Sequence, residues 1–341
     1  MSVALRWLGA MMMLGIRGSR PGDAGLEDDL DACERAGVRM VVLFDRDVAT
    51  GGERNIRSPE QLLALTRYVR ARLGGDALIA VDQEGGRVQR LSRANGFEGW
   101  VSARGFASLG PDGQASSAGS MACALRDAGI DINFAPCVDV DGVPASPVIG
   151  GLERSFAEDP GVIVGCARRV IRAHRACGVA CVLKHFPGHG SATVDSHNAL
   201  ADVSTRWDRD RELAPYWALL NERVAVMTGH LSVRALDPEL PASLSRAITS
   251  GLLRAELGFD GPVFTDALDM EGVRAGWELG EAILLAVEAG ADVVVHACNS
   301  ARGEYAADVV SAMEGVAGAI EDLPGRAAAS GRRLCALLRS G

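Results

Sequence analysis

The segment DPGVIVGCARRVIRAHRACGVACVLKHF, residues 159–186, contains one complete helix-to-strand unit and decides the fold class. Asp159 and Pro160 are the expected start of a helix, an N-cap followed by a first-turn proline. Gly178 is its expected end, because glycine readily adopts the left-handed conformation that follows a last helical turn. The run Val179–Leu183 is continuously apolar, which is typical of a strand buried on both faces of a parallel sheet.

Similar units recur along the 341 residues. Eight short apolar runs are predicted strands: Ala10–Ile16, Val38–Phe44, Ala77–Val81, Ile130–Ala135, Val179–Leu183, Val224–Met227, Pro262–Thr265 and Ala291–Ala297. Helices are predicted between them: Leu26–Ala36, Pro59–Leu73, Gln114–Ala128, Pro160–Cys177, Asp208–Glu222, Ser243–Leu257 and Glu278–Ala289. Eight strand-helix repeats favour an α/β fold, a closed (β/α)8 TIM-like barrel, over an open sheet with two lobes.

Capping residues support these boundaries. Ser58 before Pro59, and Ser243, are predicted N-caps like Asp159. Glycine is expected to close the helices and lead into the next strand at residues 37, 129, 178, 258 and 290.

No linker-like stretch divides the chain, so we expect a single catalytic barrel domain over residues 1–341. A helical C-terminal tail, Ala301–Leu323 and Gly325–Leu338, is predicted to pack against the barrel. The apolar run from Trp7 to Ile16 resembles a secretion signal, but arginines and no clean cleavage site follow it. We therefore favour a buried first strand.

Composition excludes several classes of protein. With 48% hydrophobic and 23% charged residues, the chain is not intrinsically disordered. Acidic residues exceed basic ones, 44 against 35, which argues against nucleic acid as a partner. Beyond the first residues, no run approaches the roughly 18 apolar residues of a membrane span, so no membrane partner and a cytoplasmic location are expected. The eight cysteines lack CxxC spacing and are interpreted as reduced core residues.

Lys184 is the only lysine, since the other 34 basic residues are arginines. An ammonium group is a compact, rotatable donor, unlike the planar guanidinium fork. His185 follows it directly, and three of the six histidines lie between residues 185 and 197. Chance survival of one lysine is the alternative interpretation, but this position favours a functional role.

Polar side chains follow most of the predicted strands. Active sites of such barrels lie at the carboxyl ends of the strands. The residues at these ends are Asp45, Asp82, Lys184, His185, His230, Asp266 and Asn299. Each alone is also compatible with a helix cap or a solvated loop, but their convergence favours an active site.

The connection after the fifth strand, KHFPGHGSATVDSHNALADVS, residues 184–204, is unusually long. Within it, Asp195 and His197 are two apart, and a carboxylate beside an imidazole makes His197 a candidate proton donor and acceptor. A surface turn is the simpler interpretation. A zinc site built from His185, His189, Asp195 and His197 is disfavoured, because Pro187 and Gly188 interrupt the helix that an HxxxH pair needs.

The seventh strand leads into VFTDALDM, residues 263–270. Asp266 follows the strand and is expected to project into the barrel mouth, whereas Asp269 is expected to face elsewhere. A carboxylate at the mouth can attack an electrophilic carbon, as in a retaining glycosidase. On this segment alone, Asp266 is equally compatible with a cap of the following helix.

Two further segments carry recognition groups. VDQEGGRVQRL, residues 81–91, combines Asp82 with Arg87 and Arg90, a set suited to the hydroxyl and amide groups of a sugar. GLERSFAEDP, residues 151–160, contributes Arg154, which alternatively pairs only with Glu158 or Asp159.

Taken together, the motifs resemble the family 3 glycoside hydrolases, specifically the single-domain bacterial β-N-acetylhexosaminidases of peptidoglycan recycling. The matching pieces, in order, are VDQEGGRVQR, NFAPCVDV, ERSFAEDP, KHFPGHG, DSH and TDALDM. KHFPGHG followed by DSH is the most specific of them. The resemblance implies a (β/α)8-like barrel, in agreement with the strand pattern.

The resemblance also implies residue roles. Asp266 stands at the family's catalytic nucleophile, and His197, assisted by Asp195, at the general acid/base of this branch. Substrate-binding positions that hold N-acetylglucosamine in the first subsite match Asp82, Arg90, Arg154, Lys184 and His185.

The expected reaction is hydrolysis with retained configuration through a covalent glycosyl-aspartate, acting on peptidoglycan fragments without a metal or organic cofactor. Phosphorolysis is an alternative, because a neutral histidine base does not repel inorganic phosphate. A barrel that only binds muropeptides, without turnover, is disfavoured by the intact set Asp266, His197 and Asp195.

Overall fold

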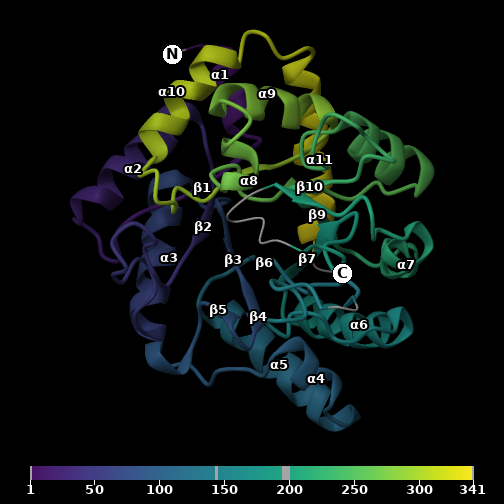
Figure 1. Cartoon of the computed structure of the whole chain (residues 1–341). Helices are drawn as coiled ribbons and strands as arrows, with labels where there is room; N and C mark the ends of the chain where they lie inside the picture. The colour runs from purple at the N-terminus through teal and green to yellow at the C-terminus, as the bar shows by residue number, and fades with distance from the viewer. Residues whose placement is uncertain (1, 143–144, 194–199, 340–341) are drawn as a thin grey trace.

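The computed structural model describes residues 2–142, 145–193 and 200–339. Its centre is a sheet of eight parallel strands in the order β11-β9-β7-β6-β3-β2-β1-β12. The two end strands meet through Phe264 and Val293, which brings the edges together into a nearly closed barrel. The predicted (β/α)8 TIM-like fold is therefore confirmed (Figure 1).

All eight predicted strands are present, most of them shorter than the apolar runs that predicted them. They are β1 Met12–Gly15, β2 Met40–Leu43, β3 Leu78–Val81, β6 Ile132–Asn133, β7 Ala180–Phe186, β9 Ala225–Thr228, β11 Val263–Thr265 and β12 Val294–His296. β1 pairs with both β2 and β12, so the favoured interpretation of the first apolar run as a buried strand is confirmed.

The predicted helices are also present around the strands. They are α2 Ala24–Ala36, α3 Pro59–Leu73, α5 Pro111–Asp127, α6 Pro160–Ala176, α7 Arg209–Leu219, η2 Ala247–Glu256 and α9 Leu279–Ala289. Near the end of the chain, α10 Ala306–Val316 packs against α2 and α9, and α11 Leu323–Leu338 packs against α1 Val3–Gly9. The sequence did not predict α1, whose last residues belong to the apolar run assigned to the first strand.

The capping pattern is confirmed at most positions. The five predicted glycines have φ between 72° and 109°, the left-handed region that suits glycine. Ser58 and Asp159 accept backbone N–H groups of the first turns of α3 and α6. Ser243 was wrongly predicted as an N-cap, because η2 begins at Ala247 and the Ser243 hydroxyl contacts His230 instead.

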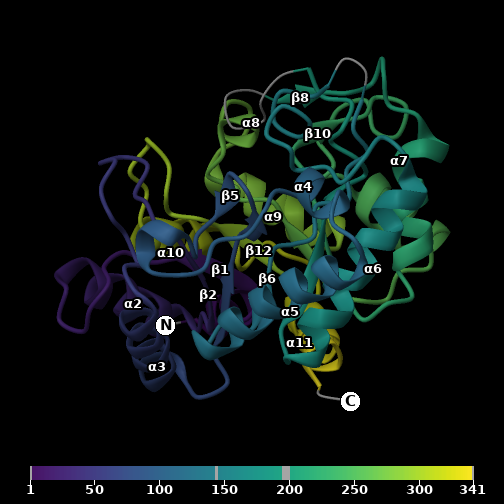
Figure 2. The same ribbon diagram turned by 90° about the horizontal axis from the view of Figure 1, so that it is seen from below.

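Several short elements extend the connections at the carboxyl ends of the strands. After β3 come the antiparallel pair β4 Gln83–Gly85 and β5 Val88–Gln89, then η1 Arg93–Asn95 and α4 Ala103–Ala107. β8 Ala201–Asp202 pairs with β10 Leu231–Ser232, and α8 Glu271–Arg274 follows β11. Figure 2 shows β5, β8, β10 and α8 together on one side of the barrel, with α11 on the other.

The core has an inner and an outer part. Side chains such as Met13, Val42, Phe134 and Phe264 fill the barrel, and the rings of Phe134 and Phe264 meet edge to face with centroids 5.8 Å apart. A larger cluster, including Leu30, packs between strands and helices.

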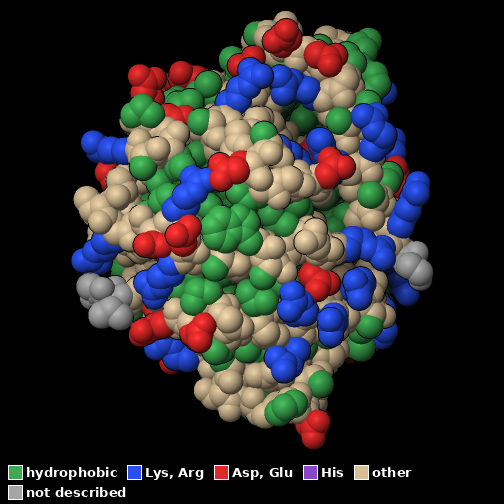
Figure 3. All heavy atoms as spheres, turned by 90° about the vertical axis from the view of Figure 1, so that its right-hand side faces the viewer, with side chains coloured by type: hydrophobic (Ala, Val, Ile, Leu, Met, Phe, Trp, Pro, Cys, Tyr) green, Lys and Arg blue, Asp and Glu red, His purple; other side chains and the backbone are tan. Residues whose placement is uncertain are grey.

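The surface fits the composition. On the face that bears α6 and α7, charged side chains of both signs are interspersed with apolar ones (Figure 3). None of the helices in the described residues combines the length and apolar character needed to cross a bilayer.

The interpretation of all cysteines as core residues was wrong for Cys335, which is exposed, and for Cys123 and Cys177, which are half-buried.

Candidate active site

Lys184 lies at the carboxyl end of β7 and joins two acidic groups. Its Nζ is 2.7 Å from Asp82 Oδ1 and 2.7 Å from Glu84 Oε1. Asp82 directly follows β3, and Glu84 lies in β4. The side chains of Lys184 and Glu84 are each only 3% exposed, whereas that of Asp82 is 20% exposed. The only lysine of the chain thus joins the carboxyl end of β7 to the connection after β3 through paired charges.

Arg154, which lies in the connection between β6 and α6, also binds Glu84. Its Nε lies 2.9 Å from Glu84 Oε2 and its Nη2 lies 2.8 Å from Oε1, which is a bidentate pair. The alternative prediction, that Arg154 pairs only with Glu158 or Asp159, is therefore wrong, because Arg154 forms its ion pair with Glu84. Asp82, Glu84, Lys184 and Arg154 form what we call the buried charge network.

The charges of this network stabilise one another. Burial favours a neutral carboxyl, but Lys184 and Arg90 outweigh it and hold the pKa of Asp82 below its usual value. Burial is likewise outweighed at Glu84, where Arg154 and Lys184 lower the pKa to about 2. Burial opposes the charged ammonium, yet Asp82 and Glu84 raise the pKa of Lys184. All members are therefore charged at neutral pH.

Arg90 lies at the more open edge of the network. Its two Nη atoms are each 3.7 Å from a carboxylate, one of Asp45 and one of Asp82, and its guanidinium lies 5.5 Å from the centroid of the Phe44 ring. About a quarter of the side chain is exposed, so Arg90 is available to a ligand. Arg87, also singled out from the sequence, is exposed on the surface.

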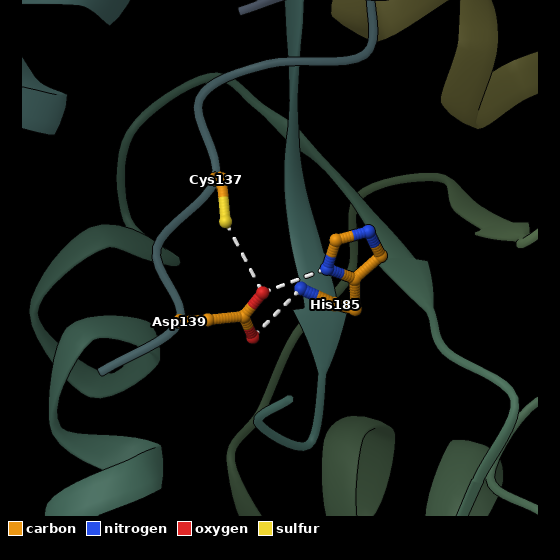
Figure 4. Close-up of side chains that lie close together, drawn as sticks. All are labelled: Cys137, Asp139 and His185. Carbon is orange, nitrogen blue, oxygen red and sulfur yellow. Dashed lines mark hydrogen bonds and ion pairs between the residues drawn. The ribbon is translucent and has the colours of Figure 1, made fainter. Parts of the chain in front are cut away.

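Asp139 holds the chain segment that contains His185. Asp139 Oδ2 lies 2.7 Å from His185 Nδ1, and Oδ1 accepts the backbone N–H of His185 (Figure 4). Oδ1 also accepts the backbone N–H of His189. His185 Nε2 lies 3.2 Å from Arg154 Nη2, which can only donate. His185 therefore carries its proton on Nδ1 and accepts through Nε2. Asp139 fixes both the position and the tautomer of this imidazole.

Cys137 completes a group that resembles a metal site. Ligand atoms of Cys137, Asp139 and His185 lie within 4.8 Å of one another. These groups already bind one another, since Asp139 Oδ2 lies 2.7 Å from His185 Nδ1 and 3.1 Å from Cys137 Sγ. Burial, followed by the charges of Asp139 and Glu84, raises the pKa of the Cys137 thiol well above its usual value. The Arg154 guanidinium also lies beside His185.

Asp266 and Asp269 differ sharply in their surroundings. Asp266 directly follows β11 and is half-buried, and its Oδ1 accepts the N–H of Ala267 at 2.8 Å. Asp269 is buried, and its two oxygens accept the N–H groups of Ala297 and Asn299 after β12. Asp266 does not cap the next helix, α8, whose N-cap is Met270. The geometry therefore leaves Asp266, rather than Asp269, at the mouth.

His230 positions the segment that carries Asp266. Its Nε2 lies 2.8 Å from the carbonyl oxygen of Ala267, so this nitrogen carries a proton, and its Nδ1 lies 2.7 Å from Ser243 Oγ. The imidazole is completely buried. The sequence placed His230 at a strand end but did not predict this contact.

The predicted acid/base pair, Asp195 and His197, lies outside the described residues. The same two residues are ligands of the alternative zinc site, so the structure does not test that site. The start of their connection is described. Ser191 Oγ donates to Glu212 of α7, and Trp207 Nε1 donates to the carbonyl of Pro187 at 3.0 Å. These contacts fix where the connection leaves β7.

A small, partly open cavity lies next to the network. Glu84 and Arg154 line it together with apolar side chains such as Phe106 and Phe156, but Asp82, Lys184 and Asp266 do not. Of the predicted substrate-binding residues, only Arg154 lines this cavity, so the cavity borders the predicted sugar subsite rather than forming it.

Two residues of the site were missed from the sequence, Glu84 and Asp139. Both lie inside the quoted motifs VDQEGGRVQR and NFAPCVDV, but in segments with no regular periodicity. Nothing in the sequence alone shows that either side chain points toward Lys184 or His185.

A barrel with converging carboxylates, an ammonium and guanidinium groups at one rim has the architecture of a (β/α)8-barrel enzyme. Residues 35–325 match the model of the glycosyl hydrolase family 3 N-terminal domain. The chain belongs to this family, which confirms the predicted resemblance. Because the family consists of glycosyl hydrolases, the protein is a glycosidase.

Relatives within the family carry a consistent name. The chain is 38% identical over 278 residues to a β-hexosaminidase of Methylococcus capsulatus, covering 78% of this chain and 80% of the relative. It is 36% identical over 257 residues to a β-hexosaminidase of Idiomarina loihiensis, covering 73% and 76%.

Solved structures agree with these relatives. The β-N-acetylhexosaminidase of Beutenbergia cavernae superposes with a TM-score of 0.82 at 30% identity, and the match covers 98% of both chains. The family 3 β-N-acetylglucosaminidase of a Paenibacillus strain gives a TM-score of 0.83 at 32% identity. That match covers 99% of this chain but 62% of the longer Paenibacillus protein.

Proposed function

We propose that the protein is a retaining β-N-acetylhexosaminidase, a β-N-acetylglucosaminidase, that hydrolyses terminal β-linked N-acetylglucosamine. The observation that carries the proposal is the buried charge network, which lies at the same rim of the barrel as Asp266. The names of the relatives support the choice of sugar.

The first subsite is assigned to Asp82, Arg90, Arg154, Lys184 and His185. Asp82 offers carboxylate oxygens to sugar hydroxyls, while Lys184 and Arg90 donate to sugar oxygens. Positive and negative charges are paired within the network, so a neutral sugar replaces water without leaving an unpaired charge. Arg154, whose donors already bind Glu84 and His185, acts mainly by holding these groups in place.

The reaction takes two steps. Asp266 attacks the anomeric carbon while protonated His197 donates to the departing oxygen, so the glycosidic bond breaks and a glycosyl ester forms. Neutral His197 then removes a proton from water, which attacks the same carbon and releases Asp266 with retained configuration. Asp195 holds and stabilises the imidazolium. The roles of His197 and Asp195 rest on the family motif.

We further propose peptidoglycan fragments, a muropeptide or its disaccharide, as the natural substrate. KHFPGHG and DSH, the motifs of the recycling branch, support this choice. Chromatography of N-acetylglucosamine released from purified muropeptides tests it. A cytoplasmic location stays a prediction, which cell fractionation will test.

Phosphorolysis is the second candidate. A histidine base is uncharged when it activates the acceptor, so inorganic phosphate is not repelled as it is by a carboxylate base. N-acetylglucosamine 1-phosphate is then the product.

The test compares wild type, Asp266→Ala and a control, Asp260→Asn, on an aryl β-N-acetylglucosaminide with and without phosphate. Asp260 is 94% exposed, so its change leaves the site intact. Phosphate-independent release that Asp266→Ala abolishes and Asp260→Asn retains supports hydrolysis. Strong dependence on phosphate supports the phosphorylase. No release by folded wild type supports the third possibility, a non-catalytic muropeptide-binding barrel, and full activity of Asp266→Ala overturns the assignment of the nucleophile.

A further inference from the structure

Two half-buried cysteines from neighbouring helices lie in contact. Cys123 is in the last part of α5, and Cys177 is the C-cap residue of α6. Their sulfur atoms are 3.2 Å apart, although 54 positions separate them in sequence. α5 and α6 pack side by side (Figures 1 and 2). Closing this gap to a disulfide of about 2.05 Å needs the sulfurs to approach by only about 1 Å.

The pair lies away from the candidate active site. α6 ends at Ala176, and β7 begins at Ala180, so Cys177 is at the amino-terminal end of that strand. Lys184 and His185 are at its carboxyl end. The pair is therefore independent of the proposed function.

The surroundings favour reaction between thiols over metal binding. Among the described residues, no third cysteine, histidine or carboxylate has a ligand atom within 4.8 Å of both sulfurs. Burial, followed by the hydrogen bond and charge of Cys123, raises the pKa of the Cys177 thiol, while the nearby Arg126 opposes this shift. The raised pKa keeps the proton on the Cys177 sulfur, so we assign the attack on the oxidant to Cys123.

We propose that Cys123 and Cys177 form a redox modification site, at which a hydroperoxide converts the two thiols into a disulfide between α5 and α6. The Cys123 thiolate attacks the peroxide oxygen, the O–O bond breaks, and the leaving oxygen takes a proton. Cys123 becomes a sulfenic acid as the peroxide is reduced. The Cys177 sulfur then attacks the Cys123 sulfur, and its proton leaves with the hydroxide as water.

Hydrogen peroxide is the probe for the test. After removal of reductant, the oxidised chain is expected to lose the mass of two hydrogen atoms, and peptide mapping is expected to show Cys123 joined to Cys177. Cys335→Ser, which removes the exposed cysteine of α11, is the matched control and should behave like wild type. Cys123→Ser and Cys177→Ser should each abolish the bond. Oxidation to sulfinic acid without a bond, or a bond between other cysteines, overturns the proposal.

The effect on stability is a second readout. A disulfide that closes a loop of this length restricts the unfolded chain. The Tm of the oxidised protein is expected to rise and to return to its starting value after reduction, with no such change in folded Cys123→Ser. A Tm that stays level or falls in the disulfide-bonded protein shows that the bond does not fit the native fold.

Discussion

Glu212 is an acidic side chain buried beneath the connection that follows β7. Its carboxylate accepts a hydrogen bond from Ser191, and Asp139 lies near enough to repel it. Burial dominates and raises the pKa of Glu212 to about 8. Its proton is therefore bound more tightly in the folded protein than in the unfolded chain.

This difference predicts how stability depends on pH. The contribution of Glu212 is fully present below the unfolded pKa of 4.5 and is lost as pH rises through about 8. Glu212→Gln keeps a carbonyl acceptor for Ser191 but does not titrate. The free energy of unfolding of wild type, relative to this variant, should fall by a few kcal/mol between about pH 5 and about pH 8.5.

Denaturant unfolding at both pH values measures this change. Glu314→Gln, which alters an exposed glutamate of α10, is the matched control and should follow wild type at each pH. A constant difference between wild type and Glu212→Gln across this range contradicts the expected titration.

Single residues of the candidate site were predictable where they follow a strand. Asp82 and Asp266 come directly after apolar runs, so the barrel topology alone places them at the mouth. Glu84 and Asp139 lie in irregular segments, where the side-chain direction depends on long-range packing. Ser243 has the residue type and position of an N-cap, but a nearby imidazole competes for its hydroxyl.

At the scale of elements, the start of the long connection after β7 is held against the segment after β6. A Cβ atom added at Gly190 would lie only 1.7 Å from the carbonyl oxygen of Val140. The close approach of these two backbones therefore requires glycine at this position. The same connection continues into Asp195 and His197.

Gly190→Ala is expected to push this connection away from its position. We predict a fall in kcat/KM of at least about ten-fold, because acid/base geometry tolerates little displacement. Circular dichroism verifies that the variant is folded at the assay temperature. Gly119→Ala in α5, where an added Cβ meets nothing within 4 Å, is the control and should retain activity. Full activity of Gly190→Ala shows that this contact does not position the connection.

Several short elements were not predicted from the sequence, for a different reason. β4, β5, β8 and β10 span two or three residues each, too few to show the alternation that marks a strand. α1 shares a continuous apolar run with β1, and such a run does not distinguish a buried helix from a buried strand.

For the whole molecule, the eight strands were predictable because both faces of a barrel strand are buried, which leaves uninterrupted apolar runs. Closure was predicted from the number of repeats. The pairing of β1 with β12 was not predicted, since it joins residues as far apart in sequence as Met12 and Val294. The contact between β11 and β12 completes the closure. Asp292, just before β12, accepts from Arg254 of η2, from Arg333 of α11 and from the backbone N–H of Val263.

Asp292 is therefore expected to stabilise the closed barrel together with its last helix. The side chain is only 3% exposed, and Asp292→Asn removes the charge that compensates two guanidinium groups. We predict a loss of about 3–5 kcal/mol in the free energy of unfolding, measured in urea, because a buried cation is left without its counter-charge. Asp260→Asn removes an exposed carboxylate that contacts the same Arg333, and it should cost less than about 1 kcal/mol. Specific activity of the folded variants should stay unchanged, since these charges lie outside the candidate site. Equal losses for the two substitutions would mean that Arg333, rather than closure of the barrel at Asp292, determines the effect.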